Sequence, residues 1–168
     1  MLDELQSTLR HRFANENLLR EALTQSVETP VESSVRSNAL LAWLGDAVVE
    51  FVVTEALYSS AARTQRPLPD KERQDIVSEN YLANVAKGLD LGGQIVNSMG
   101  KPMPVYQVSS GALAKAYEAV VAAIYVDAGL EKAREFVRRT LKLNPRDRRR
   151  RSYNSPLQIR GSLSTAHT

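Results

Sequence analysis

The chain has 168 residues, of which 43% are hydrophobic and 24% charged, and it contains no cysteine. This composition is typical of one soluble domain with a hydrophobic core, and it excludes a disulfide scaffold, a zinc ribbon and a thiol nucleophile. No run approaches the roughly twenty apolar residues of a membrane span, so we expect no membrane partner. The acidic start at Asp3 and Glu4 predicts no signal peptide and a cytoplasmic or nuclear location, rather than a mitochondrial one.

The net charge of +3 is unevenly distributed. From Lys142 onward seven basic side chains face one acid, whereas the preceding residues carry more acids than bases. We therefore predict a domain over residues 1–143 and a basic, disordered tail over 144–168. An arginine run in this tail is consistent with sequence-independent contact to RNA phosphates, and equally with a solubilising tail or a localisation signal. The run consists of Arg148, Arg149, Arg150 and Arg151.

Helical periodicity dominates the chain from its start. Leucines three and four residues apart predict a helix from the first residues to about Arg12. Asn15 stands at the N-cap position of a second helix, and residues 27–37 read as a loop. Residues 38–58 are apolar on most sides, which predicts a buried central helix, followed by a loop over 59–69.

The second half of the chain follows the same pattern. Two helical segments come first, with Gly88 or the Gly92–Gly93 pair as stops, and a long connection runs through residues 100–104. A second strongly apolar helix is expected over 112–127, ended by Gly129, and a last helix over 130–141. No segment alternates with period two for long enough to indicate a strand, so the sequence predicts an all-α fold.

Two carboxylates lie inside the apolar helices, Asp46 and Glu118. An unpaired buried carboxylate is costly enough that it becomes protonated, pairs with a cationic group or binds a cation. A plainer interpretation makes Gly45–Asp46 a helix boundary with Asp46 as N-cap, and places Glu118 on a narrow exposed stripe with Lys115. Spacing alone does not decide between these interpretations.

Four segments, in order, resemble the ribonuclease III family, and the match runs from about residue 5 to residue 140. Residues 38–48, which contain Trp-Leu-Gly-Asp-Ala-Val, resemble the family's signature helix. Residues 114–129, which contain Tyr-Glu-Ala and Ala-Ile-Tyr-Val-Asp-Ala-Gly, resemble its second motif. Residues 12–24 and 76–83 resemble its opening and its middle helices. The resemblance implies an all-α endonuclease-domain bundle that dimerises and binds double-stranded or structured RNA.

The resemblance also implies an active site that hydrolyses RNA. In this site two acids on each of two helices hold Mg²⁺ or Mn²⁺. Asp46 and Glu118 match two of these acids and are the expected catalytic and metal-binding residues, whereas Ala42 and Lys115 stand at the other two positions. Glu50, one turn beyond Asp46, is a candidate replacement ligand.

The degenerate positions leave a second interpretation open. An ion pair between Lys115 and Glu118 would occupy the remaining acid of the later helix. The alternative to an endoribonuclease is then a catalytically inactive structural or interaction protein on the same fold, for example one associated with the ribosome.

Trp43 matches the aromatic residue that packs into the partner subunit in the family. The resemblance therefore implies a homodimer with Trp43 at its interface. A plain core tryptophan is the alternative.

Overall fold

The computed structural model describes residues 2–25 and 37–143, and its elements there are helices. No β-strand forms in these ranges beyond isolated bridges at Val96, which confirms the predicted all-α class. No helix among the described residues is both long and apolar enough to cross a bilayer. The elements in chain order are α1 (Leu2–Leu9), α2 (Glu16–Ala22), α3 (Ala39–Thr64), α4 (Asp70–Val77), α5 (Glu79–Gly88), η1 (Gly92–Gln94), η2 (Val105–Gln107), α6 (Ser110–Ala128) and α7 (Leu130–Thr140).

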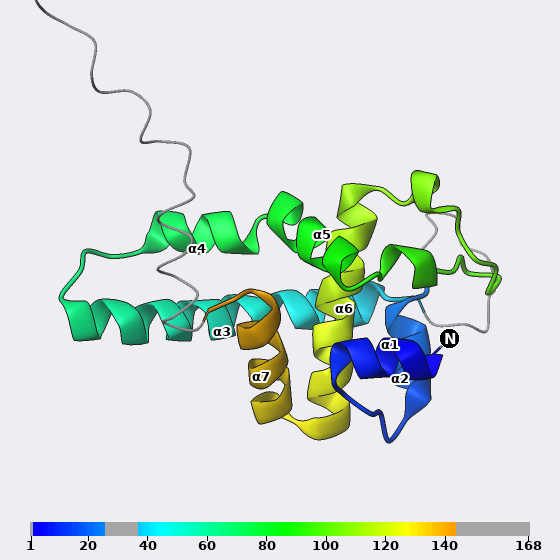
Figure 1. Ribbon diagram of the computed structural model, residues 1–168, viewed down its shortest axis with the longest axis horizontal. Helices are drawn as coiled ribbons and strands as arrows, with labels where there is room; N and C mark the ends of the chain where they lie inside the picture. The colour runs from blue at the N-terminus through cyan, green and yellow to red at the C-terminus, as the bar shows by residue number, and fades with distance from the viewer. Residues whose placement is uncertain (1, 26–36, 144–168) are drawn as a thin grey trace, which may run out of the picture.

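Helix α6 is the centre of the fold. Every side chain from Ala119 to Ile124 is buried, and the helix packs against α2, α3, α5 and α7. Figure 1 shows it crossing α3. The hydroxyl of Ser109 caps its first turn by accepting from the Ala112 amide at 3.1 Å, and Gly129, with φ of 84°, ends it as predicted. A helix that is apolar on most sides has to be covered by other elements, which accounts for this arrangement.

Helix α3 is longer than predicted. It continues from Tyr58 to Thr64, so the expected loop over residues 59–69 is wrong for its first half. No glycine or proline interrupts residues 59–64, and the hydroxyl of Thr64 donates to the Ser60 carbonyl at 2.8 Å instead of competing with the helix. The helix ends where Gln65 adopts a left-handed conformation, with φ of 50°.

The N-terminal helices follow the prediction except at one boundary. Helix α1 ends at Leu9, before the predicted Arg12, because Arg10 is left-handed with φ of 54°. The amide of His11 then donates back to the Gln6 carbonyl at 3.1 Å, which closes the helix end. The predicted cap of α2 is confirmed, since Asn15 Oδ1 accepts from the Asn17 amide at 3.1 Å.

Asp127, near the end of α6, holds the start of α2. Its carboxylate accepts hydrogen bonds from the backbone amides of Ala14 at 3.1 Å and Asn15 at 3.0 Å, and it contacts His11 Nε2 at 2.9 Å. Burial alone would raise the pKa of Asp127, but these donors outweigh it and lower the pKa below its ordinary value. Asp127 and His11 therefore have a structural role in joining α6 to α2.

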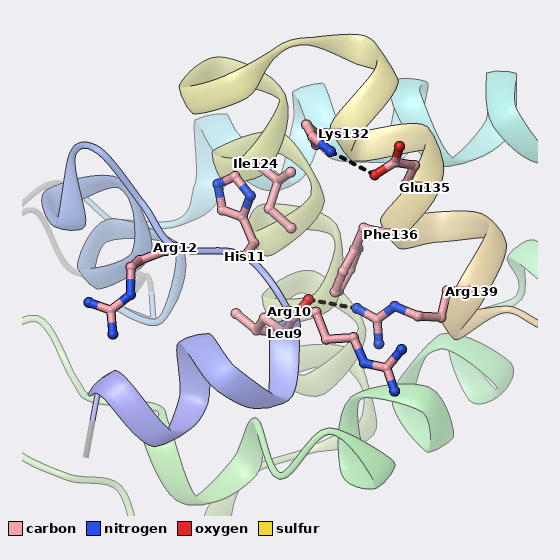
Figure 2. A pocket seen from close by; sticks show the side chains of 9 residues that line it. All are labelled: Leu9, Arg10, His11, Arg12, Ile124, Lys132, Glu135, Phe136 and Arg139. Carbon is pink, nitrogen blue, oxygen red and sulfur yellow. Dashed lines mark hydrogen bonds and ion pairs between the residues drawn. The ribbon is translucent and has the colours of Figure 1, made fainter.

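Helix α7 packs against both α6 and α3. Phe136 and Val137 point into the core, as predicted. Arg139 Nη2 donates to the Leu9 carbonyl at 2.6 Å, which ties α7 to the end of α1 (Figure 2).

Candidate active site

Gly45 determines how closely α3 and α6 approach. It lies in the interior of α3 and is buried, so the alternative that placed a helix boundary at Gly45–Asp46 is wrong. A β-carbon at position 45 would lie 1.8 Å from the backbone oxygen of Glu118, a distance that no side chain can occupy. The two backbones therefore touch at this point, and Asp46 and Glu118 lie beside the contact.

Asp46 and Glu118 form an uncompensated pair of carboxylates. Asp46 is exposed and Glu118 is half-buried. Burial, followed by the charges of Asp46 and Glu79, raises the pKa of Glu118 to about 7, while Lys115 opposes the shift. Neither Asp46 nor Glu118 has a hydrogen bond or ion pair to its side chain within the described part of the chain. Two such groups are chemically suited to share a proton or to bind a cation.

Glu79, the first residue of α5, is a third acid beside this pair. A β-carbon on Gly111 would lie 3.5 Å from Glu79 Oε2, which puts the Glu79 carboxylate over the first turn of α6. Gly111 shares a face of α6 with Lys115 and Glu118, since four and seven residues bring a helix back to the same side. Glu79 could not be identified from the sequence, because nothing in a polar helix start indicates which acid will face another helix.

The two degenerate positions differ in their surroundings. Ala42 is buried in the core, one turn before Asp46. Lys115 is exposed and forms no ion pair with the described residues, so the Lys115–Glu118 ion pair considered under the second interpretation is not formed. Its positive charge still acts on Glu118, because it lowers the pKa that burial and Asp46 raise.

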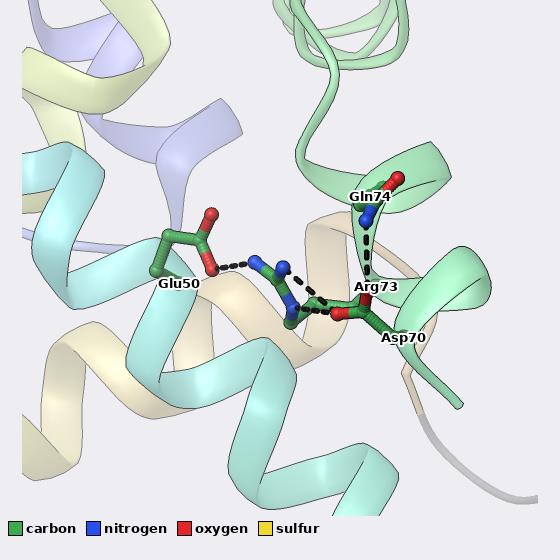
Figure 3. A network of polar contacts seen from close by, with 4 residues as sticks. All are labelled: Glu50, Asp70, Arg73 and Gln74. Carbon is green, nitrogen blue, oxygen red and sulfur yellow. Dashed lines mark hydrogen bonds and ion pairs between the residues drawn. The ribbon is translucent and has the colours of Figure 1, made fainter. Parts of the chain in front are cut away.

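Glu50 lies one turn beyond Asp46 on α3, but its carboxylate already has a partner. Arg73 Nη1 contacts Glu50 Oε2 at 2.5 Å, and Arg73 Nη2 contacts Asp70 Oδ1 at 2.9 Å (Figure 3). The hydrogen bond that Arg73 donates to Glu50 is the main reason why the pKa of Arg73 is raised. Glu50 therefore joins α3 to α4 and is not one of the uncompensated acids.

The donor set for a divalent cation is small. Across residues 2–25 and 37–143, no three or more histidines, aspartates and glutamates are arranged to hold a metal ion. Asp46 and Glu118 fit such an ion as two hard oxygen donors with uncompensated charge, and water would have to fill the other coordination positions.

Trp43 is not a core residue. Its side chain is 77% exposed, so the alternative of a plain core tryptophan is wrong. It lies on a face of α3 that also exposes Leu40, Phe51 and Tyr58, and we call this face the α3 stripe. A groove of about 550 Å³ lies beside the C-terminal end of α3. It is lined mainly by apolar side chains, among them Tyr58 and Leu68. The arginine run over 148–151 lies outside the described residues.

Comparison with solved structures identifies the class of protein to which this fold belongs. The chain is similar to the nuclease domain of ribonuclease III from Campylobacter jejuni, with a TM-score of 0.70 and 30% identity over 84% of this chain and 93% of that chain. A second structure of that domain, described for flexibility in a region involved in dimer formation, matches with the same TM-score over 87% of this chain and 99% of that chain. The fold is that of a ribonuclease III nuclease domain.

Sequence comparison gives the same assignment. A family model described as Ribonuclease-III-like matches residues 15–144. Ribonuclease 3 of Clostridium tetani is 36% identical over 136 residues, which cover 81% of this chain and 58% of the relative. Ribonuclease 3 of Campylobacter curvus is 36% identical over 143 residues, covering 84% and 62%. The chain belongs to the ribonuclease-III-like family, and it spans about three fifths of the length of these curated relatives.

Proposed function

We propose that this chain is an endonuclease domain that binds double-stranded RNA and hydrolyses its phosphodiester bonds with Mg²⁺ or Mn²⁺ held by Asp46 and Glu118. The observation that carries the proposal is the pairing of these carboxylates beside the α3–α6 contact, without a counter-charge bound to either. Burial and then the charge of Asp46 raise the pKa of Glu118, and a bound cation would favour its ionised form. The curated relatives, named Ribonuclease 3, support the same activity.

In the proposed hydrolysis, the metal ion and the side chains would have different roles. A divalent cation at this position would activate a water molecule and stabilise the leaving oxygen. Asp46 and Glu118 would anchor it, since Mg²⁺ commonly binds through one or two carboxylates and keeps several waters. Glu79 would add negative potential from α5, which favours the cation without contacting it.

Lys115 supports a second candidate function, which is RNA binding without cleavage. An ammonium 4 Å from a divalent ion would repel it by about 8 kcal/mol at an effective dielectric constant near 20, twice the value for two unit charges. This is an upper bound, because Lys115 is exposed and its flexible chain can move the charge into solvent. The two functions differ in whether Lys115 turns away when the cation binds.

A homodimer is the assembly that the α3 stripe supports. Trp43 and Tyr58 are separated by about 22 Å along the helix, given the helical rise per residue. A two-fold axis near Phe51 would lay Trp43 of each protomer beside the groove at the far end of the partner's α3. The dimer would thereby cover large apolar side chains that a monomer leaves in water.

The test is cleavage of long duplex RNA by the purified chain with Mg²⁺, with Mn²⁺, and with the metals chelated. We expect metal-dependent cleavage that Asp46→Asn and Glu118→Gln each reduce at least about a hundredfold, as expected for the loss of a group that holds the metal. Asp75→Asn, at an exposed acid on α4, is the matched control and should retain activity.

The double variant Ala42→Glu with Lys115→Asp separates the two candidates. If the wild type binds duplex RNA but cleaves only after this change, the second candidate is correct. If the wild type cleaves and the double variant is slower, the two-carboxylate site is correct. Absence of RNA binding by the wild type at low salt would refute both.

A further inference from the structure

A basic pocket lies near the C-terminal end of α6. It shares no residue with the site formed by Asp46 and Glu118. It has a volume of about 340 Å³ and opens between the end of α1, α6 and α7 (Figure 2). Its floor is apolar and buried, formed by Leu9, Ile124 and Phe136. Four permanently cationic side chains line it, namely Arg10, Arg12, Lys132 and Arg139.

Two of these cations have no counter-charge. Lys132 is neutralised by Glu135, with 3.0 Å between Nζ and Oε2. Arg12 approaches Asp3 only to 3.8 Å, and both side chains are exposed, so that contact is weak. Arg10 and Arg139 form no ion pair with any described residue. The pocket therefore carries an excess of positive charge.

The exposed Arg10 lies close enough to Arg139 for its charge to act on that guanidinium group. Arg139 is fixed by its hydrogen bond to the Leu9 carbonyl, and its guanidinium carbon lies 5.4 Å from the centre of the Phe136 ring. Burial and the charge of Arg10 lower the pKa of Arg139. Arg10 in turn has a left-handed backbone, which is uncommon outside glycine. An anion between the two groups would relieve their repulsion.

We propose that this pocket binds a phosphate group, held by Arg10 and Arg139, with any attached organic group packing on the apolar floor. Guanidinium groups present paired donors that match the oxygens of a phosphate, and they keep their charge at all physiological pH values. Two sources carry this chemistry, the backbone of an RNA strand and a free phosphate or nucleotide. The proposal does not depend on cleavage at Asp46 and Glu118.

The test titrates the full chain with three probes at constant ionic strength: inorganic phosphate, adenosine 5′-monophosphate and a short RNA duplex. Arg10→Gln removes an exposed charge whose side chain makes no contact that the fold needs. Arg139→Lys retains the charge but loses the paired donors. Arg20→Gln, an exposed arginine on α2 outside the pocket, is the matched control. Calorimetry gives the dissociation constants, and thermal unfolding verifies that each variant is folded.

We expect Arg10→Gln to weaken phosphate and nucleotide binding about tenfold, the typical loss of one charge-assisted hydrogen bond, with no change in Arg20→Gln. Arg10→Gln could also lower the affinity for the RNA duplex and reduce the number of counterions released on binding by about one. In that case the bound phosphate is that of RNA. If duplex binding is unchanged, the ligand is a free phosphate. The proposal is overturned if the wild type shows no saturable phosphate binding, or if Arg10→Gln and Arg20→Gln bind all three probes equally.

Discussion

Gly45 and Glu118 touch through their backbones, and Asp46, the residue after Gly45, lies near enough for its charge to raise the pKa of Glu118. The glycine carries no side chain, so α3 and α6 cross at a distance that any other residue would increase. The fold therefore depends on position 45 for its stability, and the proposed chemistry depends on it for geometry.

Gly45→Ala should lower the free energy of unfolding by about 3 kcal/mol, the upper range for inserting a carbon into a packed interior, because a backbone oxygen cannot move aside. Gly88→Ala is the control, since a β-carbon there would meet nothing within 4 Å. Urea unfolding measures both variants. Equal stability of the two would show that the helices do not touch as described.

Glu118→Gln should change how stability depends on pH. The pKa of Glu118 is about 7 in the folded protein and 4.5 in the unfolded chain, so the folded state binds more protons in this window. The stability of the wild type should therefore fall as pH rises from 4.5 to 7, by about 1–2 kcal/mol after allowance for solvent screening of a half-exposed group.

The measurement is urea unfolding of both proteins across this pH range without divalent metal. Glu118→Gln should lack the decline and exceed the wild type in stability at pH 8. Identical pH profiles would contradict a raised pKa at Glu118.

Mn²⁺ should stabilise the wild type against unfolding at pH 8, where Glu118 is ionised. Binding to the folded state alone adds about 2.7 kcal/mol when the metal is at a hundred times its dissociation constant. Asp46→Asn and Glu118→Gln should lose most of this increment, and Asp75→Asn should retain it. An increment that is the same in all four proteins would place the metal elsewhere.

Lys115→Asp should tighten Mn²⁺ binding at least about tenfold, because it replaces a repelling charge with an attracting one on the face of α6 that carries Glu118. Lys87→Asp, at an exposed lysine near the end of α5, is the charge-matched control and should have little effect. Isothermal titration calorimetry measures both. Unchanged affinity in Lys115→Asp would mean that the ammonium already points away from the metal.

Trp43→Ala should dissociate the proposed dimer. A large aromatic side chain buried in an interface commonly contributes 2 kcal/mol or more, and a two-fold dimer loses two of them, about 4 kcal/mol, which corresponds to an association about a thousandfold weaker. Tyr106→Ala removes an equally exposed aromatic side chain outside α3 and should leave the assembly unchanged. Light scattering across a concentration series gives the masses. A wild type that is monomeric at all concentrations would rule out the dimer.

Features encoded by neighbouring residues could be predicted from the sequence. The cap at Asn15, the stop at Gly129 and the buried faces of α6 and α7 depend on local signals, and all were predicted correctly. The end of α3 was not, because serine and threonine are common both in loops and in the last turns of helices.

The candidate site required more than local signals. Their apolar surroundings singled out Asp46 and Glu118 and the resemblance to the family gave them a role, but spacing alone was equally consistent with a helix boundary at Gly45. Glu79 and the Arg73 partner of Glu50 come from elements distant along the chain, so only packing brings them together. Sequence periodicity indicates which face of a helix is buried, but it does not identify the neighbouring element.

Asp127 has a consequence for how the protein is made. The amides that it holds, at Ala14 and Asn15, precede it by more than a hundred residues. A ribosome adds about 5–20 residues each second, so the first helices wait several seconds before this carboxylate is synthesised. During that interval α2 lacks the surface of α6 against which it packs in the folded domain. The nascent chain is thus vulnerable to aggregation during this interval, which ends when α6 has left the exit tunnel.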